Sequence, residues 1–170
     1  MAIGATDETM TDYPEKIDRL RKYWESLAGG QTPERHQVDP AAITGLLPYL
    51  LLIEFETNPF RVRYRLTGTV VDQMTGMNIS GRYLDEFAVG IYAESVDQLQ
   101  QDYVVCHATG RSVINTYHWP AGEGYFLHVC YGLFPLAIGG QIRQCLSIED
   151  YGELTYDSKV IDWSVPLKEK

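Results

Sequence analysis

The chain lacks the long apolar run that a membrane-spanning helix needs. Such a helix takes about 20 consecutive apolar residues, whereas the longest run here, Leu46 to Ile53, contains Pro48 and has the length of a strand. The first residues, 1–12, also lack the basic segment and apolar stretch of a secretory signal peptide. We therefore predict no membrane partner, and we interpret residues 1–12 as a disordered tail.

Cysteine is scarce as well. The chain has three cysteines, Cys106, Cys130 and Cys145, and an odd number without close pairing argues against a disulfide framework. No pair of histidines or cysteines shows the short spacing of a zinc site, so no metal is predicted. Reduced thiols are expected, and with them a cytoplasmic location.

Basic residues are few. The chain has 14 Lys and Arg against 23 Asp and Glu, which gives a net charge of −9. An acidic protein repels the phosphate backbone of a nucleic acid. The arginines at 61, 63 and 65 form the only candidate basic patch and are too few to outweigh the total. The composition therefore predicts that nucleic acid is not a partner.

Catalytic signatures are missing too. The segment 76–81 lacks the fixed glycine positions of a nucleophile elbow or a phosphate loop. Cys106 and His107 are neighbours on a predicted helix, so their side chains diverge by about 100° and make a poor nucleophile–base pair. The adjacent acids Glu149 and Asp150 are interpreted as solvated turn residues. No catalytic residue is predicted, and the protein is not expected to be an enzyme.

The sequence does contain clear periodic patterns, beginning with an amphipathic helix at 13–30. Its apolar residues recur three and four apart and form one stripe, and two glycines end the helix. The pattern predicts packing on the helix's own domain, and in addition a contact with the same stripe of a second copy in a homodimer. The residues of the stripe are Ile17, Leu20, Trp24 and Leu27.

Strand and helix patterns alternate along the rest of the chain. Residues 60–67 alternate strictly, with Val62, Tyr64 and Leu66 on one face and arginines on the other, as in a half-buried strand. A long helix is predicted at 91–109, and hairpin-length links predict antiparallel strands after it. Further elements are a helix at 41–47, a strand at 49–56, a helix at 69–76, strands at 112–119, 125–133 and 141–151, and an extended arm at 152–170.

This order, with several local motifs, resembles a PAS domain. The motifs are RLTGT at 65–69, MTG at 74–76 and ISGRYL at 79–84. A second group is similar to small single-domain PAS proteins of the alphaproteobacterial type: Trp24, Leu27, Pro33, Arg35, Asp39, Pro40, Ile43, Leu46, Leu47 and Pro48.

The resemblance implies an α+β fold with a PAS core at 31–151. Its five-stranded antiparallel sheet would carry helices on one face, and the added helix at 13–30 would cover the other. The family implies sensing or regulation, so we expect a non-enzymatic sensor that acts in signal transduction through an unidentified protein partner. A small molecule held between sheet and helices would gate that interaction. The candidate pocket residues are Tyr64, Leu66, Tyr83, Phe87 and Tyr103, with His107 and Asn115 as polar anchors.

Alternatives stay open at this point. The aromatic residues of the pocket could simply pack the core, and no cofactor is specified. Haem could be ligated by His107, and flavin could bind without a covalent bond. An adduct-forming photosensor is excluded because the segment 78–84 lacks the cysteine of that motif. A cone-shaped lyase or isomerase fold would require His118 and an acidic residue to meet in a deep cavity.

Overall fold

The structure, a computed structural model, describes residues 13–122 and 125–152 and contains one five-stranded antiparallel sheet in the order β2-β1-β5-β4-β3. The predicted tail at 1–12, and all of the predicted arm except Gly152, lie outside the described residues. The strands are β1 Leu50–Glu56, β2 Arg61–Thr67, β3 Val113–Gly122, β4 Tyr125–Ile138 and β5 Gln141–Asp150. The α-helices are α1 Glu15–Leu27, α2 Thr69–Thr75 and α3 Ala93–Thr109. Short 3-10 helices are η1 Arg35–Gln37, η2 Pro40–Tyr49, η3 Leu84–Phe87 and η4 Gly90–Tyr92.

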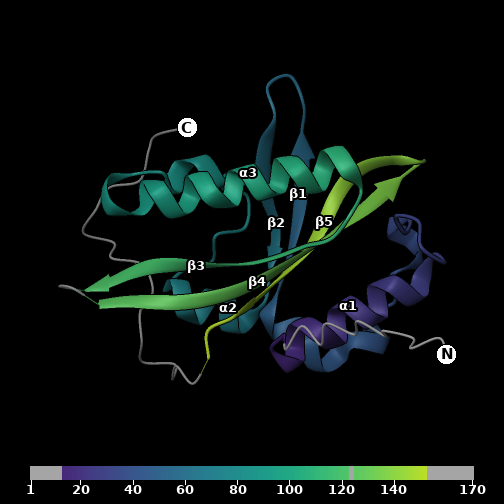
Figure 1. Cartoon of the computed structure of the whole chain (residues 1–170), viewed down its shortest axis with the longest axis horizontal. Helices are drawn as coiled ribbons and strands as arrows, with labels where there is room; N and C mark the ends of the chain where they lie inside the picture. Colours follow the sequence, from purple (N-terminus) through teal and green to yellow (C-terminus); the bar gives the residue numbers. More distant parts are fainter. Residues whose placement is uncertain (1–12, 123–124, 153–170) are drawn as a thin grey trace, which may run out of the picture.

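The sheet has a separate hydrophobic core on each face. We call inner core the cluster between the sheet and α2, η3 and α3, and outer core the cluster between the sheet and α1 and η2. Figure 1 shows α3 and α1 on opposite sides of the sheet. On the inner face, the sheet and the helices α2, η3 and α3 together enclose a layer of side chains.

Helix α1 packs on its own domain, as one of the two interpretations of its stripe predicted. Ile17 and Leu20 are fully buried in the outer core, and the indole N–H of Trp24 donates to the carbonyl of Pro135 at 2.8 Å. Leu27 packs at the edge of the same core. Ile17 and Leu20 are therefore out of reach of a second copy. Trp24 and Leu27 are only partly buried, so a dimer contact through them stays a prediction.

The strict alternation predicted for β2 breaks at a β-bulge. Leu52 pairs with Leu66 but Ile53 pairs with Tyr64, so Arg65 is an extra residue in the strand. An extra residue sends the following side chains to the opposite face. Tyr64 is buried in the inner core, whereas Leu66 is 60% exposed and lies beside the outer core. The prediction that Leu66 faces the pocket was wrong.

Three element boundaries also differ from the prediction. The long helix begins at Ala93, after η4, and Ile91 is 64% exposed instead of buried. Strand β4 continues to Ile138, because residues 131–137 are buried on both faces and show no alternation that the sequence could reveal. Strand β3 continues to Gly122, into the segment predicted as a turn.

None of the helices within 13–122 and 125–152 is both long and apolar enough to cross a bilayer.

Candidate ligand-binding cavity

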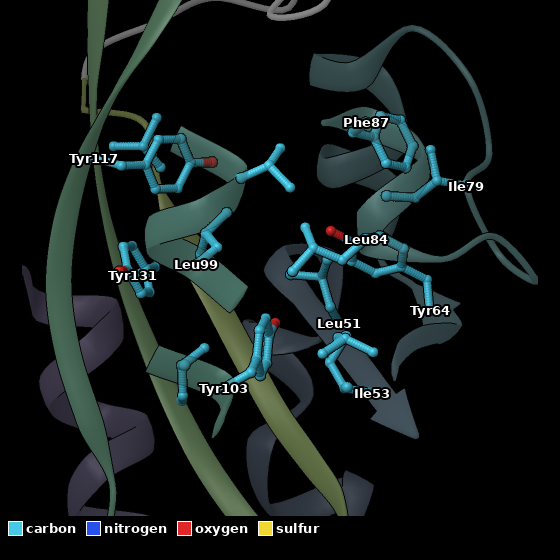
Figure 2. Close-up of a cluster of buried hydrophobic side chains, with 14 of the residues drawn as sticks. Leu51, Ile53, Tyr64, Ile79, Leu84, Phe87, Leu99, Tyr103, Tyr117 and Tyr131 are labelled. Atoms are coloured by element: carbon cyan, nitrogen blue, oxygen red, sulfur yellow. The ribbon is translucent and has the colours of Figure 1, made fainter. Parts of the chain in front are cut away.

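A cavity lies in the inner core between the sheet and helices α2, η3 and α3. Figure 2 shows Tyr117 and Leu99 on one side of this region, facing Tyr64, Ile79 and Phe87 on the other. Its lining is mostly apolar and comes from segments that are far apart in sequence. The lining residues are Leu51, Tyr64, Val71, Thr75, Ile79, Leu84, Phe87, Val96, Leu99, Tyr117, Trp119 and Glu149.

The size of the cavity limits what it can hold. Its volume is about 40 Å³. An engineered cavity of ~150 Å³ accepts benzene. At about 40 Å³ the cavity in this shape is several times smaller than that. It is too small for a haem or a flavin ring system, and a one-ring molecule would enter only if the surrounding helices moved apart.

Glu149 is the charged residue of the lining. It stands on the inner face of β5, because it alternates with Ile148, which is buried in the outer core. The hydroxyl of Tyr117 donates to Glu149 Oε1 at 3.3 Å, and the hydroxyl of Tyr151 donates to Glu149 Oε2. Both tyrosines are themselves buried. A carboxylate is thus held in place beside an apolar cavity by two hydroxyl groups.

Burial shifts the pKa of the Glu149 carboxyl and of the two tyrosine hydroxyls that donate to it. Burial raises the pKa of Glu149 above its ordinary value of 4.5, while the hydrogen bonds from Tyr151 and Tyr117 act in the opposite direction. Burial, together with the charge of Glu149, raises the pKa of Tyr117 and of Tyr151 well above 10.0. The two phenols therefore stay protonated at neutral pH and act as hydrogen-bond donors.

A Glu149→Gln substitution should change how stability depends on pH. Since the folded state raises the pKa of Glu149, it binds more protons than the unfolded state from pH 4.5 up to the folded pKa. The free energy of unfolding therefore falls across that window, and the loss is complete above it. The Glu149→Gln side chain does not titrate, so the variant does not lose stability in this window. We expect its advantage over the wild type to grow as pH rises from 4.5 and then to level off, measured by urea unfolding. A constant difference across pH would contradict the raised pKa.

Comparison with known proteins identifies the family. The sequence profile of the family described as PAS domain matches residues 13–123. This chain belongs to the PAS family. The five-stranded antiparallel PAS fold that the sequence predicted is confirmed. A search among curated proteins found no match.

Solved structures share the PAS fold at low sequence identity. VqmA bound to DPO is 17% identical, with a TM-score of 0.50 over 68% of this chain and 57% of that chain. A fungal LOV domain photoreceptor is 13% identical, with a TM-score of 0.48 over 88% of this chain and all of that chain (100%). An RNA-binding LOV receptor is 17% identical, with a TM-score of 0.47 over 72% of this chain and 36% of that chain. This PAS chain spans little more than half of VqmA, and at such identities the likeness concerns the fold.

The exclusion of nucleic acid on the basis of net charge was wrong. VqmA of Vibrio cholerae is solved as a complex with ligand and DNA, and another neighbour is named as an RNA-binding receptor. VqmA, which shares the fold of this chain, therefore occurs with DNA. The physical reason is that net charge sums over the whole chain, whereas phosphate contacts depend on local patches and on segments beyond the shared domain.

The PAS cavity gathers only part of the predicted ligand site. Tyr64 and Phe87 line it, and their role in binding stays a prediction. Tyr103 is buried in the same inner core but lies outside the lining, with its hydroxyl 2.9 Å from that of Ser147. The side chain of Tyr83 lies outside the lining. Its hydroxyl donates to Glu56 Oε1 at 2.7 Å, and the guanidinium carbon of Arg61 lies 3.6 Å from the centre of its ring.

The two polar anchors predicted for the pocket lie outside its lining. The ring of His107 is 5.1 Å from that of Phe55 and 5.2 Å from that of Phe60, and it borders a different hollow. Asn115 is exposed and donates to Asp102 at 3.0 Å. The last turn of α3 thus places His107 beyond the cavity, so it cannot ligate haem there.

The polar groups that do border the cavity were missed. Glu149 was interpreted as a surface acid because it is adjacent to Asp150. The alternation of β5 could have identified it: Cys145 and Ser147 precede it on the inner face, and Leu146 and Ile148 occupy the outer face.

The histidine required by the lyase or isomerase alternative lies elsewhere. His118 and His128 are paired across β3 and β4, with ring centroids 4.9 Å apart, and both are exposed. Neither lines the cavity. The arrangement therefore offers no acid–base pair of His118 with Glu149.

Proposed function

We propose that this PAS protein is a non-enzymatic sensor that holds a small organic molecule in the inner cavity and signals through contact with another protein. The observation that carries the proposal is the cavity itself, a small apolar space with a fixed carboxylate at its wall, which a one-ring molecule would occupy by widening it. Binding sites for small molecules are typically apolar with a few placed polar groups.

Occupancy of the cavity would act on the helices. The lining includes Val71 and Thr75 of α2 and Val96 and Leu99 of α3, so a ligand would touch both helices and the sheet at once. A ligand shifts an equilibrium only by its different affinities for the two states. The signal would therefore be a change in how α2 and α3 pack on the sheet.

A protein partner is supported by an apolar groove on the other face. Leu47 and Leu66 are 39% and 60% exposed and line this groove beside the outer core. The proposed partner surface includes these two residues. A homodimer remains part of the proposal, through a surface other than the buried residues of α1.

We also propose a cytoplasmic location and a narrower family relationship for this PAS protein. The free thiols of Cys106, Cys130 and Cys145 support a cytoplasmic location. The motifs at 24–48 support the narrower resemblance to PAS proteins of the alphaproteobacterial type.

Filling the cavity should abolish binding. Val96 lines the cavity on α3, so Val96→Phe would place a phenyl ring in the space that a ligand needs. We expect one-ring compounds from a fragment library to shift backbone amide signals of cavity residues in the wild type. In the Val96→Phe variant those shifts should be lost, with apparent affinity at least ~10-fold weaker.

The matched control is Val104→Phe, the same change on the 44% exposed side of α3. It should keep both the fold and the binding. If no one-ring compound binds to the wild type, or if both variants bind alike, the inner cavity is not the ligand site.

A further inference from the structure

We propose that the inner cavity selects small nitrogen bases, whose protonated nitrogen forms an ion pair with the carboxylate of Glu149. This inference rests on the proposed function and names the chemical class of its ligand. The ligand would have a one-ring apolar body and a single cationic group.

The first support is that Glu149 has no cationic partner among residues 13–122 and 125–152. Its hydrogen-bond partners there are the neutral hydroxyls of Tyr117 and Tyr151. Each donates one hydrogen bond to one carboxylate oxygen, and each oxygen can accept a second. A cation in the cavity would complete both the charge and the hydrogen bonds of the site.

A fully buried acid elsewhere in the chain shows the contrast with the half-buried Glu149. Glu86 is 1% exposed, and Arg82 lies 3.3 Å from it as an ion-pair partner. At Glu86 the fold therefore places a cation beside a buried acid. Among residues 13–122 and 125–152 it places none beside Glu149, which borders the cavity.

The second support is that the carboxylate is already prepared for a cation. Its partial removal from water takes place on folding, and the two hydroxyls fix its position before any ligand arrives. A preorganised charge in a site of low dielectric attracts an opposite charge more strongly than the same group in water. An anionic ligand would be repelled by the same group.

The third support is the remaining wall of the cavity. Leu51, Val71, Ile79, Leu84 and Phe87 form an apolar surface around the acid. A hydrated inorganic cation would leave this surface unused, because it needs oxygen ligands on several sides. An amine with a hydrophobic ring uses both the acid and the apolar wall.

Three probes of the same ring size test the proposal: benzylamine, benzyl alcohol and benzoate. They are titrated into the whole protein by calorimetry at pH 7. We expect benzylamine to bind at least ~10-fold more tightly than benzyl alcohol, and benzoate to bind most weakly. If no probe binds, the proposed function fails together with this inference. If benzyl alcohol binds as tightly as benzylamine, the cavity remains a ligand site but the inference is overturned.

The variant Glu149→Gln removes the charge with little change of shape. It should reduce the affinity for benzylamine to about that for benzyl alcohol, so that the variant no longer distinguishes the two probes. An unchanged preference for benzylamine would overturn the role of Glu149. Amide NMR spectra of the variant show whether it is folded.

A second measurement uses the wild type alone. Benzylamine stays protonated between pH 4 and 8, so its affinity should fall as Glu149 takes up a proton in acid, while that of benzyl alcohol stays level. The neighbouring phenols of Tyr64, Tyr117 and Tyr151 have pKa values raised above 10.0 and do not titrate in this range. Equal pH profiles for the two probes would overturn the ion pair even if the variant did not fold.

Discussion

Leu20→Asp should leave the protein largely unfolded at neutral pH. Leu20 is fully buried in the outer core beneath α1. The change removes a buried apolar side chain, which lowers the free energy of unfolding by about 2–5 kcal/mol. It also buries a carboxylate among apolar side chains, which lowers it by a further several kcal/mol. The total stability of a domain of this size is only about 5–15 kcal/mol. The loss is therefore of the same size as the whole stability.

Circular dichroism and thermal unfolding measure this effect. The matched control is Leu66→Asp, the same substitution at a residue that is 60% exposed. It should cost about 1 kcal/mol or less, mainly through the poor strand preference of Asp. A folded Leu20→Asp protein with a near-native melting temperature would show that α1 does not cover the sheet.

Gly68→Ala should destabilise the protein by about 3 kcal/mol or more. A Cβ atom at Gly68 would lie 2.3 Å from the carbonyl oxygen of Pro48 and 2.4 Å from that of Leu47. Both are backbone atoms, so neither can turn aside as a flexible side chain would. The amide of Gly68 also donates to the carbonyl of Leu50 at 2.7 Å, which fixes the two segments together.

Urea unfolding of the two alanine variants provides the measurement. The control is Gly45→Ala, where an added Cβ would meet only the guanidinium of Arg19, at 3.6 Å. That variant should differ from the wild type by less than about 1 kcal/mol. Similar losses in both variants would show that the start of α2 is not packed tightly against the end of η2.

Local patterns allowed the helices and strands to be predicted. The stripe of α1 places Ile17 and Leu20 in a core because side chains three apart share one face of a helix. Val96, Leu99 and Tyr103 of α3 are buried for the same reason. Each of these signals involves only neighbours along the chain, so the sequence alone carries it.

The candidate site could be predicted only in part. Tyr64 and Phe87 follow from the position of β2 and η3 beside the helices. Their neighbours in the site depend on contacts between distant segments. Tyr117 and Glu149 are brought together by two strand pairings, of β3 with β4 and of β4 with β5.

The sequence by itself determined the order of elements, the amphipathic helix at the N-terminal side and the membership of the PAS family. Only the tertiary structure decided that Leu66 faces outward and that Glu149 faces the cavity. The reason is physical: periodicity reports which residues share a face of one element. Which face becomes the inner one, and where a bulge reverses it, depends on the register with strands distant in sequence.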